Sequence, residues 1–206
     1  MRKPASIKGL ETLGRVRLSK HFFLRDFLYS DVAAIYGLSN IPDDPDLAIA
    51  AGKQLCDELL EPIVSAFGPI TIRSAYRSAE VNRVCNEKGE NCASNEKNAA
   101  AHIWDLRDKD GCMGAVACIV VPKYLEHYEA TGEWQPIAWW IHDHLPYDEL
   151  EFYPKLCAFN IGWHERPTRQ IFSYINPRGI LTRPGMDNHE GDHSEYYADL
   201  TPVVFG

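Results

Sequence analysis

Residue types that bind metals and transfer protons are concentrated in one short stretch of this 206-residue chain. The stretch HIWDLRDKDG contains His102, Asp105, Asp108 and Asp110 and ends at Gly111. Imidazole nitrogens and carboxylate oxygens are the ligands that zinc and harder divalent cations take in proteins. The spacing is not that of an EF-hand loop, which also needs a terminal bidentate glutamate. A solvated acidic turn is therefore the alternative interpretation of this stretch.

The elements around this stretch are predicted from hydrophobic periodicity and turn residues. Apolar residues recur at three- and four-residue steps from Leu47 to Phe67, which predicts a helix with an aspartate before it and Gly68-Pro69 after it. The apolar run 115–121, ended by a proline, predicts a buried central strand. Further strands are expected around ITIRSAY, ELEFY, CAFNIGW and RQIFSYI, with helices starting near Ser78 and over 123–131 and 136–145.

The order of these elements predicts the fold class and the domain organisation. Helices that precede a group of late strands indicate an α+β domain in which helices pack on a small antiparallel sheet. We expect this domain to span residues 19–176. Residues 1–18 are predicted to form an extended arm, and residues 177–206 a C-terminal extension that wraps the surface.

Composition excludes several function classes. A net charge of −8 argues against general nucleic-acid binding, which needs a cationic face. No apolar run approaches the length of a membrane span. The basic N-terminus MRKPASIKGLETLGRVRLSK lacks the apolar segment of a signal peptide, so synthesis in the cytoplasm without export is expected.

The six cysteines contain no CxxC spacing, which weakens a structural-zinc or thioredoxin-type interpretation. In a chain without an export signal, most are expected to be reduced and buried. Cys85 and Cys92 flank the polar loop within VCNEKGENC, and a disulfide between them is the alternative.

Four segments carry a family pattern in chain order: LSKHFFLRDFLYSDVAAIYGLSNIP, GPITIRSAYRSAEVN, GAVACIVVP and LPYDELEFYPKLCAFNIGWHERPTRQIF. Together they resemble the zinc D-Ala-D-Ala carboxypeptidase family, which also supplies phage endolysins and shares the hedgehog-type fold. The resemblance covers roughly residues 18 to 175. It implies a hedgehog/D-Ala-D-Ala-peptidase-like domain with a cleft for peptidoglycan peptides.

The resemblance also implies where three zinc ligands should lie. Carried over without gaps, the histidine and aspartate of SxHxxGxAxD fall on Gly111 and Cys118, and the later histidine falls on Asn160. Glycine offers no ligand, and asparagine is a poor one for zinc. Cysteine can bind zinc as a thiolate, but one thiolate alone does not make a zinc site. The family's ligand positions are therefore predicted to be degenerate.

A second ligand set would need an insertion in this alignment. His102 can be the family's first histidine, displaced by the extra loop, with Asp105, Asp110 and His164 completing a site. On a strand, however, His164 lies about 13 Å from Asn160, because positions four apart are separated by four residue rises. His164 therefore cannot take the place of Asn160 without a shift in strand register.

The family positions that are retained line or brace its cleft. The resemblance implies that Arg77 and Asn82 lie there, and that Arg77 holds an anionic group, which suits a guanidinium fork. The alternative is that Arg77 caps a turn or pairs with a central acid. Glu151 is a weak candidate for the general base, and the catalytic residues stay unknown.

The remaining histidines have simpler interpretations. His142 and His144 should face different ways on their helix, and Trp139 and Trp140 are expected in the core or a groove. His189 and His193, in DNHEGDHSEYY, are expected in a polar tail.

The loss of all three ligand positions favours a non-catalytic peptidase-like domain, with no cofactor, that acts as a structural or binding module. Phage-associated relatives of the family suggest a virion or prophage protein with protein partners or self-assembly. The alternative is a zinc-dependent peptidase or amidase acting on peptidoglycan stem peptides.

Overall fold

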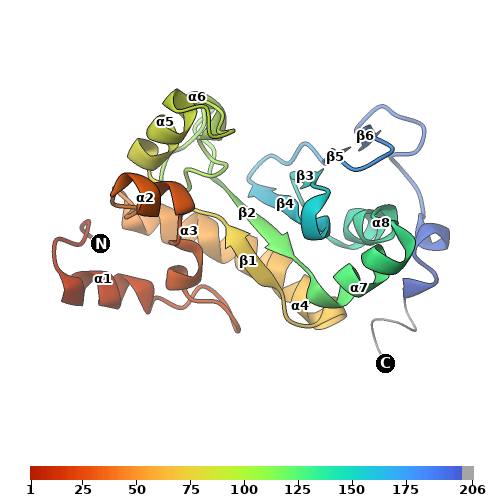
Figure 1. Ribbon diagram of the computed structural model, residues 1–206, viewed down its shortest axis with the longest axis horizontal. Helices are drawn as coiled ribbons and strands as arrows, with labels where there is room; N and C mark the ends of the chain where they lie inside the picture. Colours follow the sequence, from red (N-terminus) through yellow and green to blue (C-terminus); the bar gives the residue numbers. More distant parts are fainter. Residues whose placement is uncertain (201–206) are drawn as a thin grey trace.

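The computed structural model describes residues 1–200 as an α+β fold built on one six-stranded mixed sheet (Figure 1). The strands lie in the order β1-β2-β4-β3-β5-β6. Their bounds are β1 Thr71–Ser74, β2 Gly114–Val120, β3 Glu149–Phe152, β4 Phe159–His164, β5 Gln170–Ser173 and β6 Gly179–Thr182. The helices are α1 Ile7–Gly14, α2 Asp31–Tyr36, α3 Pro45–Leu55, α4 Glu61–Phe67, α5 Ala79–Glu87, α6 Asn95–Asn98, α7 Pro122–Thr131 and α8 Gln135–His144.

The long helix expected from the periodicity forms as α3 and α4, joined through a π-helical turn, η2 (Cys56–Leu60). Asp44 caps its start, since its Oδ1 accepts a hydrogen bond from the backbone N–H of Leu47 at 3.1 Å. Gly68 ends it with a φ of +81°, a conformation that a side chain disfavours. The apolar stripe of this helix packs on the sheet and supplies much of the core.

In β2 and β3, successive side chains alternate between the two faces of the sheet, as expected for extended backbone. In β2, Ala115, Ala117 and Ile119 point into the core with α3 and α8, while Cys118 points to the opposite face. The same alternation places Leu150 and Phe152 of β3 in the core and Glu151 on the opposite face. The predicted strand over 115–121 and the three later strands are confirmed.

The sheet differs from the expected antiparallel one in two ways. β3 pairs with β5 in parallel, whereas the remaining neighbours are antiparallel. In the sequence, β4 lies between β3 and β5. In the sheet, β4 pairs with one edge of β3 and leaves the other edge free to pair with β5. β6 comes from the expected C-terminal extension and adds the edge strand beside β5.

The N-terminal arm is not extended throughout, because α1 forms within it. Ser6 caps this helix by accepting a hydrogen bond from the backbone N–H of Gly9 at 3.1 Å. Leu13 is fully buried, and the N-terminus and Lys3 pair with Asp46 and Asp43 at the start of α3. The arm was predicted without a helix because its few apolar residues give a weak pattern.

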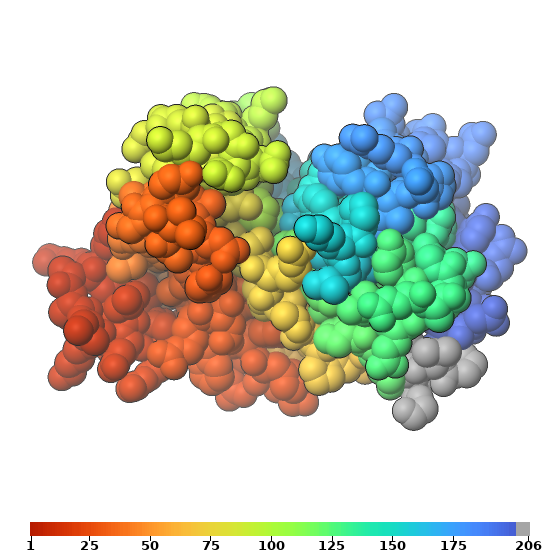
Figure 2. Space-filling model, in the orientation of Figure 1, coloured from red at the N-terminus to blue at the C-terminus, as the bar shows by residue number. Residues whose placement is uncertain are grey.

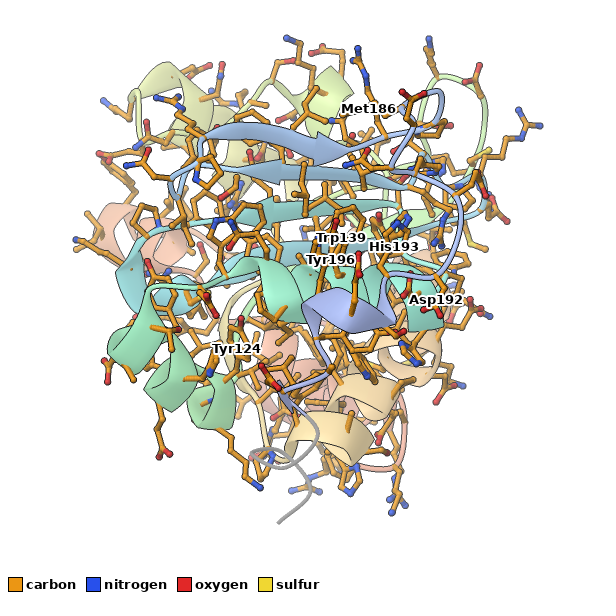
Figure 3. All side chains as sticks on the ribbon, turned by 90° about the vertical axis from the view of Figure 1, so that its right-hand side faces the viewer. Tyr124, Trp139, Met186, Asp192, His193 and Tyr196 are labelled. Atoms are coloured by element: carbon orange, nitrogen blue, oxygen red, sulfur yellow. A yellow bond between two sulfur atoms is a disulfide. The ribbon has the colours of Figure 1, made fainter. Side chains whose placement is uncertain are left out.

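The segment after β6 was expected to be a polar tail, and this expectation is wrong for its two histidines. His189 and His193 are buried, and the segment 183–200 packs across α8 (Figure 3). The ring of His193 stacks on Trp139 at 4.2 Å, and its Nδ1 lies 2.7 Å from Asp143 Oδ1. We call residues 183–200 the C-terminal strap; residues 201–206 of the extension lie outside the described residues.

Within residues 1–200, no helix combines the length and the apolar composition that a membrane crossing requires.

Candidate functional site

The polar face of the sheet forms the floor of a cleft of about 850 Å³. One wall is lined from α2, from the loop between α5 and α6, and from α6, and the other from β3, β4 and the chain after β5. Figure 2 shows this hollow between the residues around α5–α6 and those around β5–β6. The polar residues that line it are Asp31, Arg73, Ser74, Arg77, Glu90, Asn91, Asn98, His102, Cys118, Glu151, Tyr153, Asn160 and Tyr174.

Strand register assembles the floor of the cleft. Cys118 of β2 pairs with Asn160 of β4, and Asn160 pairs in turn with Glu151 of β3. Ser74 of β1 continues the same row on the other side of Cys118. Residues paired across neighbouring strands point to the same face, so these four side chains form one line across the sheet. Two of the expected family ligand positions, Cys118 and Asn160, are thus direct neighbours.

His102 reaches this cleft from the loop between α6 and β2. Its ring is anchored because Nδ1 lies 2.8 Å from the carbonyl oxygen of Ala75, and its own carbonyl accepts a hydrogen bond from the backbone N–H of Arg77 at 2.8 Å. A carbonyl can only accept, so Nδ1 carries the proton and Nε2 keeps a free lone pair. Burial, with the charge of Arg77, lowers the pKa of His102 to about 3, so the ring is neutral.

The structure places His102, and not Gly111, beside Cys118 and Asn160. Gly111 is exposed, has a φ of +78° and lies in the turn that follows Asp108. Residues 103–111 form a loop that leaves the cleft before β2 begins, so the structure does not bring Gly111 to Cys118 and Asn160.

Asn160 and Glu151 are tied together by a local network. The Asn160 amide nitrogen donates to Glu151 Oε2 at 3.1 Å and to the Tyr153 hydroxyl at 3.0 Å. The Tyr153 hydroxyl also donates to Glu151. The amide nitrogen of Asn160 is therefore fully used as a donor, and Oε2 of the candidate base Glu151 is held by two donors.

Cys118 is a protonated thiol in this setting. Burial raises the pKa of Cys118, although Arg73 and Arg77 lie close enough to favour the thiolate. The floor of the cleft thus combines a neutral thiol, a donating amide, the hydrogen-bonded carboxylate of Glu151 and one imidazole. Among residues 1–200 no three zinc-ligand groups are placed to hold one ion, so the residues present do not fit a three-ligand zinc site.

The second ligand set is not brought together. Asp105 accepts hydrogen bonds from the backbone N–H groups of Asp43 and Asp44 and from the Tyr76 hydroxyl, so it ties the start of α3 to β1. His164 Nε2 lies 3.3 Å from Asp108 Oδ2, and His164 pairs with Gly114 at the opposite end of β2 from Cys118.

Asp110 is exposed in the turn. Among residues 1–200, no three histidine, cysteine or acidic side chains are placed to hold one metal ion. The structure therefore does not bring His102, Asp105, Asp110 and His164 together, because separate structural contacts hold them apart.

Asn82 braces the wall that carries Arg77. Its amide nitrogen donates to the carbonyl of Ala93 at 3.1 Å and to Asn95 Oδ1 at 2.8 Å, while its oxygen accepts from Asn98 at 2.9 Å. Asn82 is fully buried, so its role is to hold the loop after α5 and not to contact a ligand. Arg77 lines the cleft, as expected from the resemblance.

A disulfide between Cys85 and Cys92 closes the same loop, with the two Cα atoms 5.6 Å apart. This pairing was the open alternative in the sequence, and the structure supports it. The other four cysteines are free and buried.

Arg73, Asn98 and Tyr153 are among the cleft residues that were not identified from the sequence. Arg73 sits in the quoted strand ITIRSAY, and alternation along that strand was a usable signal. Tyr153 and Asn98 gave no signal, because their positions depend on strand pairing and on the loop closed by the disulfide.

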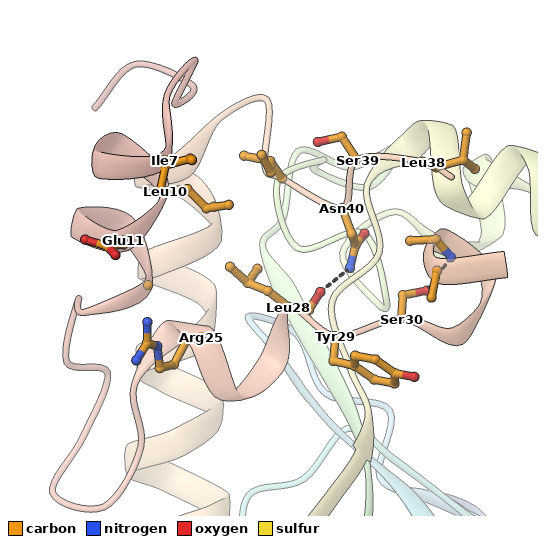
Figure 4. Close-up of a pocket in the computed structure, with 14 residues that line it drawn as sticks. Ile7, Leu10, Glu11, Arg25, Leu28, Tyr29, Ser30, Leu38, Ser39 and Asn40 are labelled. Carbon is orange, nitrogen blue, oxygen red and sulfur yellow. Dashed lines mark hydrogen bonds between the residues drawn. The ribbon is translucent and has the colours of Figure 1, made fainter. Parts of the chain in front are cut away.

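A second cavity of about 560 Å³ lies between α1 and the chain around α2 (Figure 4). Its lining is mainly aliphatic, from Ile7, Leu10, Leu28, Leu38 and Ile41. The amide nitrogen of Asn40 already donates hydrogen bonds to the carbonyl oxygens of Leu28 and Tyr76, so it is not available to a ligand in this cavity. Glu11, Arg25 and Tyr29 also line this cavity, but the residues singled out from the sequence line the cleft, which stays the candidate site.

Comparison with known proteins gave no match: no family model, no curated protein and no solved structure is similar to this chain.

Proposed function

We propose that the chain is a non-catalytic domain of the D-Ala-D-Ala-peptidase type, with the hedgehog-type fold, that serves as a binding or structural module. The observation that carries this proposal is the row Cys118, Asn160 and Glu151. The resemblance assigns two of the family's metal ligands to Cys118 and Asn160 of this row, which are paired across β2 and β4, and Asn160 donates hydrogen bonds to Glu151 and Tyr153. The resemblance to phage members supports a role in a virion or prophage.

Metal content and cleavage test this proposal directly. Protein purified without chelators should contain far less than one zinc ion per chain, and it should not release alanine from peptides ending in D-Ala-D-Ala or cleave peptidoglycan. Near-stoichiometric zinc together with cleavage, both lost in His102→Ala, would overturn the proposal in favour of a zinc peptidase.

Restoring the missing ligands tests the assignment of the cleft. The variant Cys118→Asp/Asn160→His adds a carboxylate and an imidazole beside His102, which makes a His-Asp-His set. We expect it to bind about one zinc ion per chain. A matched variant adds His102→Ala and Gly111→His to the same pair, and it should not bind zinc because residue 111 lies in the outer turn.

The proposal also includes binding, either between copies of this chain or to another partner. Native mass measurement of the purified chain should show self-assembly if the module is structural. A monomer that is retained by peptidoglycan sacculi or by a protein partner would favour the binding role.

A further inference from the structure

The N-terminal end of the molecule exposes a large share of the apolar surface. Among residues 1–200, thirteen large hydrophobic side chains are exposed, and seven of them belong to residues 1–36. Ile7, Leu10 and Tyr29 are three of these seven, and they line the cavity between α1 and the chain around α2 (Figure 4). Exposed apolar side chains gathered in this way mark interaction sites. We call the residues that line this cavity, from Ile7 to Ile41, the N-terminal groove.

The chain around this groove carries an excess of positive charge. Residues 1–41 contain seven lysines and arginines and three acids, a net charge of +4, whereas the rest of the chain carries −12. Lys3 pairs with Asp43, and Arg15 pairs with Glu11. The cations of this region that form no ion pair within residues 1–200 are Arg2, Lys8, Arg17, Lys20 and Arg25. Asp26 and Asp31 also lack an ion pair there, so these unpaired side chains leave a surplus of three positive charges.

The opposite end of the molecule carries a complementary surface. Figure 1 shows α1 at one end of the long axis and the C-terminal strap, residues 183–200, at the other. The strap contains five acids and one arginine, a net charge of −4. All five acids are exposed: Asp187, Glu190, Asp192, Glu195 and Asp199. Met186 and Tyr196 are exposed on the same segment (Figure 3), so the strap presents apolar side chains among negative charges.

These two surfaces favour a second copy of the chain as the occupant of the N-terminal groove. Because they lie at opposite ends of the molecule, they can meet only between copies. A groove that faced another groove would bring two positive surfaces together, which opposes association. The strap instead brings acids to the unpaired cations, and the flexible, unbranched side chain of Met186 suits an irregular aliphatic space.

We propose that the chain associates head to tail, with the C-terminal strap of one copy docked in the N-terminal groove of the next. Met186 packs on the aliphatic lining, and the strap acids face Arg25 and the other unpaired cations. Such a contact joins two different surfaces, so it extends into a filament, or closes into a ring where the rotation between copies permits. This contact specifies the partner in the structural role proposed above, and it rests on that role.

Sedimentation velocity of the intact chain tests this contact. In low salt the weight-average mass should rise with protein concentration beyond that of a dimer, and it should fall at about 0.5 M salt, where exposed charges are screened. Ile7→Glu/Arg25→Glu disrupts the groove, and Met186→Ser/Glu195→Gln disrupts the strap. Each variant alone should associate at least about tenfold more weakly than the unmodified chain.

Leu106→Glu/Lys109→Glu is the matched control for the groove variant. It replaces one exposed aliphatic side chain and one exposed cation by glutamate, outside both surfaces, and should associate like the unmodified chain. An equal loss of association in this control, or a monomer at every concentration of the unmodified chain, would overturn the proposed contact.

Mixing the two defective variants distinguishes a head-to-tail contact from a symmetric one. The groove variant keeps its strap and the strap variant keeps its groove, so an equal mixture should form a one-to-one heterodimer and nothing larger. This recovery also shows that both variants fold. If the strap variant alone associates like the unmodified chain, the contact is not made by the strap and the proposal is wrong. The zinc and cleavage tests of the proposed function do not depend on these results, so the two proposals can fail separately.

Discussion

The neutral imidazole of His102 makes the protein sensitive to acid. Its pKa in the fold is about 3, below the ordinary value of 6.5, so the unfolded chain binds the extra proton first as pH falls. The stability that this group contributes is fully present above about pH 6.5 and is lost as the pH falls toward about 3. We expect the urea midpoint to fall between pH 7 and pH 4, and to fall less in His102→Gln.

His21→Gln is the control for that experiment, because His21 is partly exposed beside Glu61 and lies outside the cleft lining. A histidine ring signal assigned to His102 by nuclear magnetic resonance should not titrate between pH 8 and pH 5. A midpoint near the ordinary value would contradict the buried, neutral state.

Gly114 is required by a close approach of two backbones. A Cβ at this position would lie 1.9 Å from the carbonyl oxygen of Ala100 and 2.8 Å from His164 Cδ2. The contact positions the loop that carries His102, since Val116 N–H donates to the Ala101 carbonyl at 2.9 Å. Gly114→Ala should lower the free energy of unfolding by roughly 2–4 kcal/mol, because a backbone atom cannot move aside as a side chain can.

Gly162→Ala, on the facing strand, is the matched control for Gly114→Ala. There the nearest atom is Val116 Cγ2 at 3.1 Å, at the end of a side chain that can shift. Chemical denaturation of the two variants compares them, and an equal cost at both positions would show that the backbone contact is not the cause.

At the scale of elements, the disulfide is expected to hold the cleft wall in place. It joins residues separated by seven positions, and closing a loop of this size in the unfolded chain stabilises the fold by about 2–3 kcal/mol. Cys85→Ser/Cys92→Ser should lose about that amount in urea denaturation and exchange amide hydrogens faster over residues 86–94. Unchanged exchange in this loop would mean that Asn82 holds it without the disulfide.

The C-terminal strap depends on Asp143 of α8. This carboxylate accepts hydrogen bonds from the backbone N–H and Nδ1 of His193 and from the Tyr197 hydroxyl. These donors outweigh burial and lower the pKa of Asp143 below its ordinary value of 3.8. The stabilisation by the Asp143 carboxylate is therefore present above about pH 3.8, and it is lost as the pH falls through the lower pKa of the folded state.

Asp143→Ala should release the strap, at a cost of roughly 2–3 kcal/mol, because hydrogen bonds to a charged group are lost. Hydrogen exchange over residues 183–200 should then increase even at pH 7. Asp187→Ala, an exposed change within the same segment, should leave this exchange as it is. Equal exchange in the two variants would mean that the ring stacking of His193 on Trp139 is sufficient.

Elements with a strong periodic pattern were predicted, and those defined by tertiary contacts were not. The helix over α3 and α4 and the central strand β2 follow from apolar spacing alone. The strap could not be predicted, because the burial of His189 and His193 depends on partners in α8 and β6. The cleft was predicted in part: Arg77, Cys118, Asn160 and Glu151 line it, but the position of His102 needed the loop geometry.

At the scale of the whole molecule, the strand order joins both halves of the chain. β1 and β2 come before α7, and β3 to β6 come after α8, yet β2 pairs with β1 on one side and β4 on the other. The cleft lies across this junction, so its two walls come from different halves. The row Cys118, Asn160 and Glu151 needs both halves, because Cys118 lies on β2 and the other two lie on β4 and β3.

This topology predicts a single cooperative unfolding transition. One buried cluster includes Leu13 from α1, Ile63 from α4, Ile141 from α8 and Leu200 from the strap, so the arm, the sheet and the strap share one core. Trp104 and Trp134 are buried in different halves, so tryptophan fluorescence follows the unfolding of both halves. Urea curves followed by tryptophan fluorescence and by far-ultraviolet circular dichroism should superimpose. Two separated transitions would show instead that one half retains its structure alone, against the single core that both halves share.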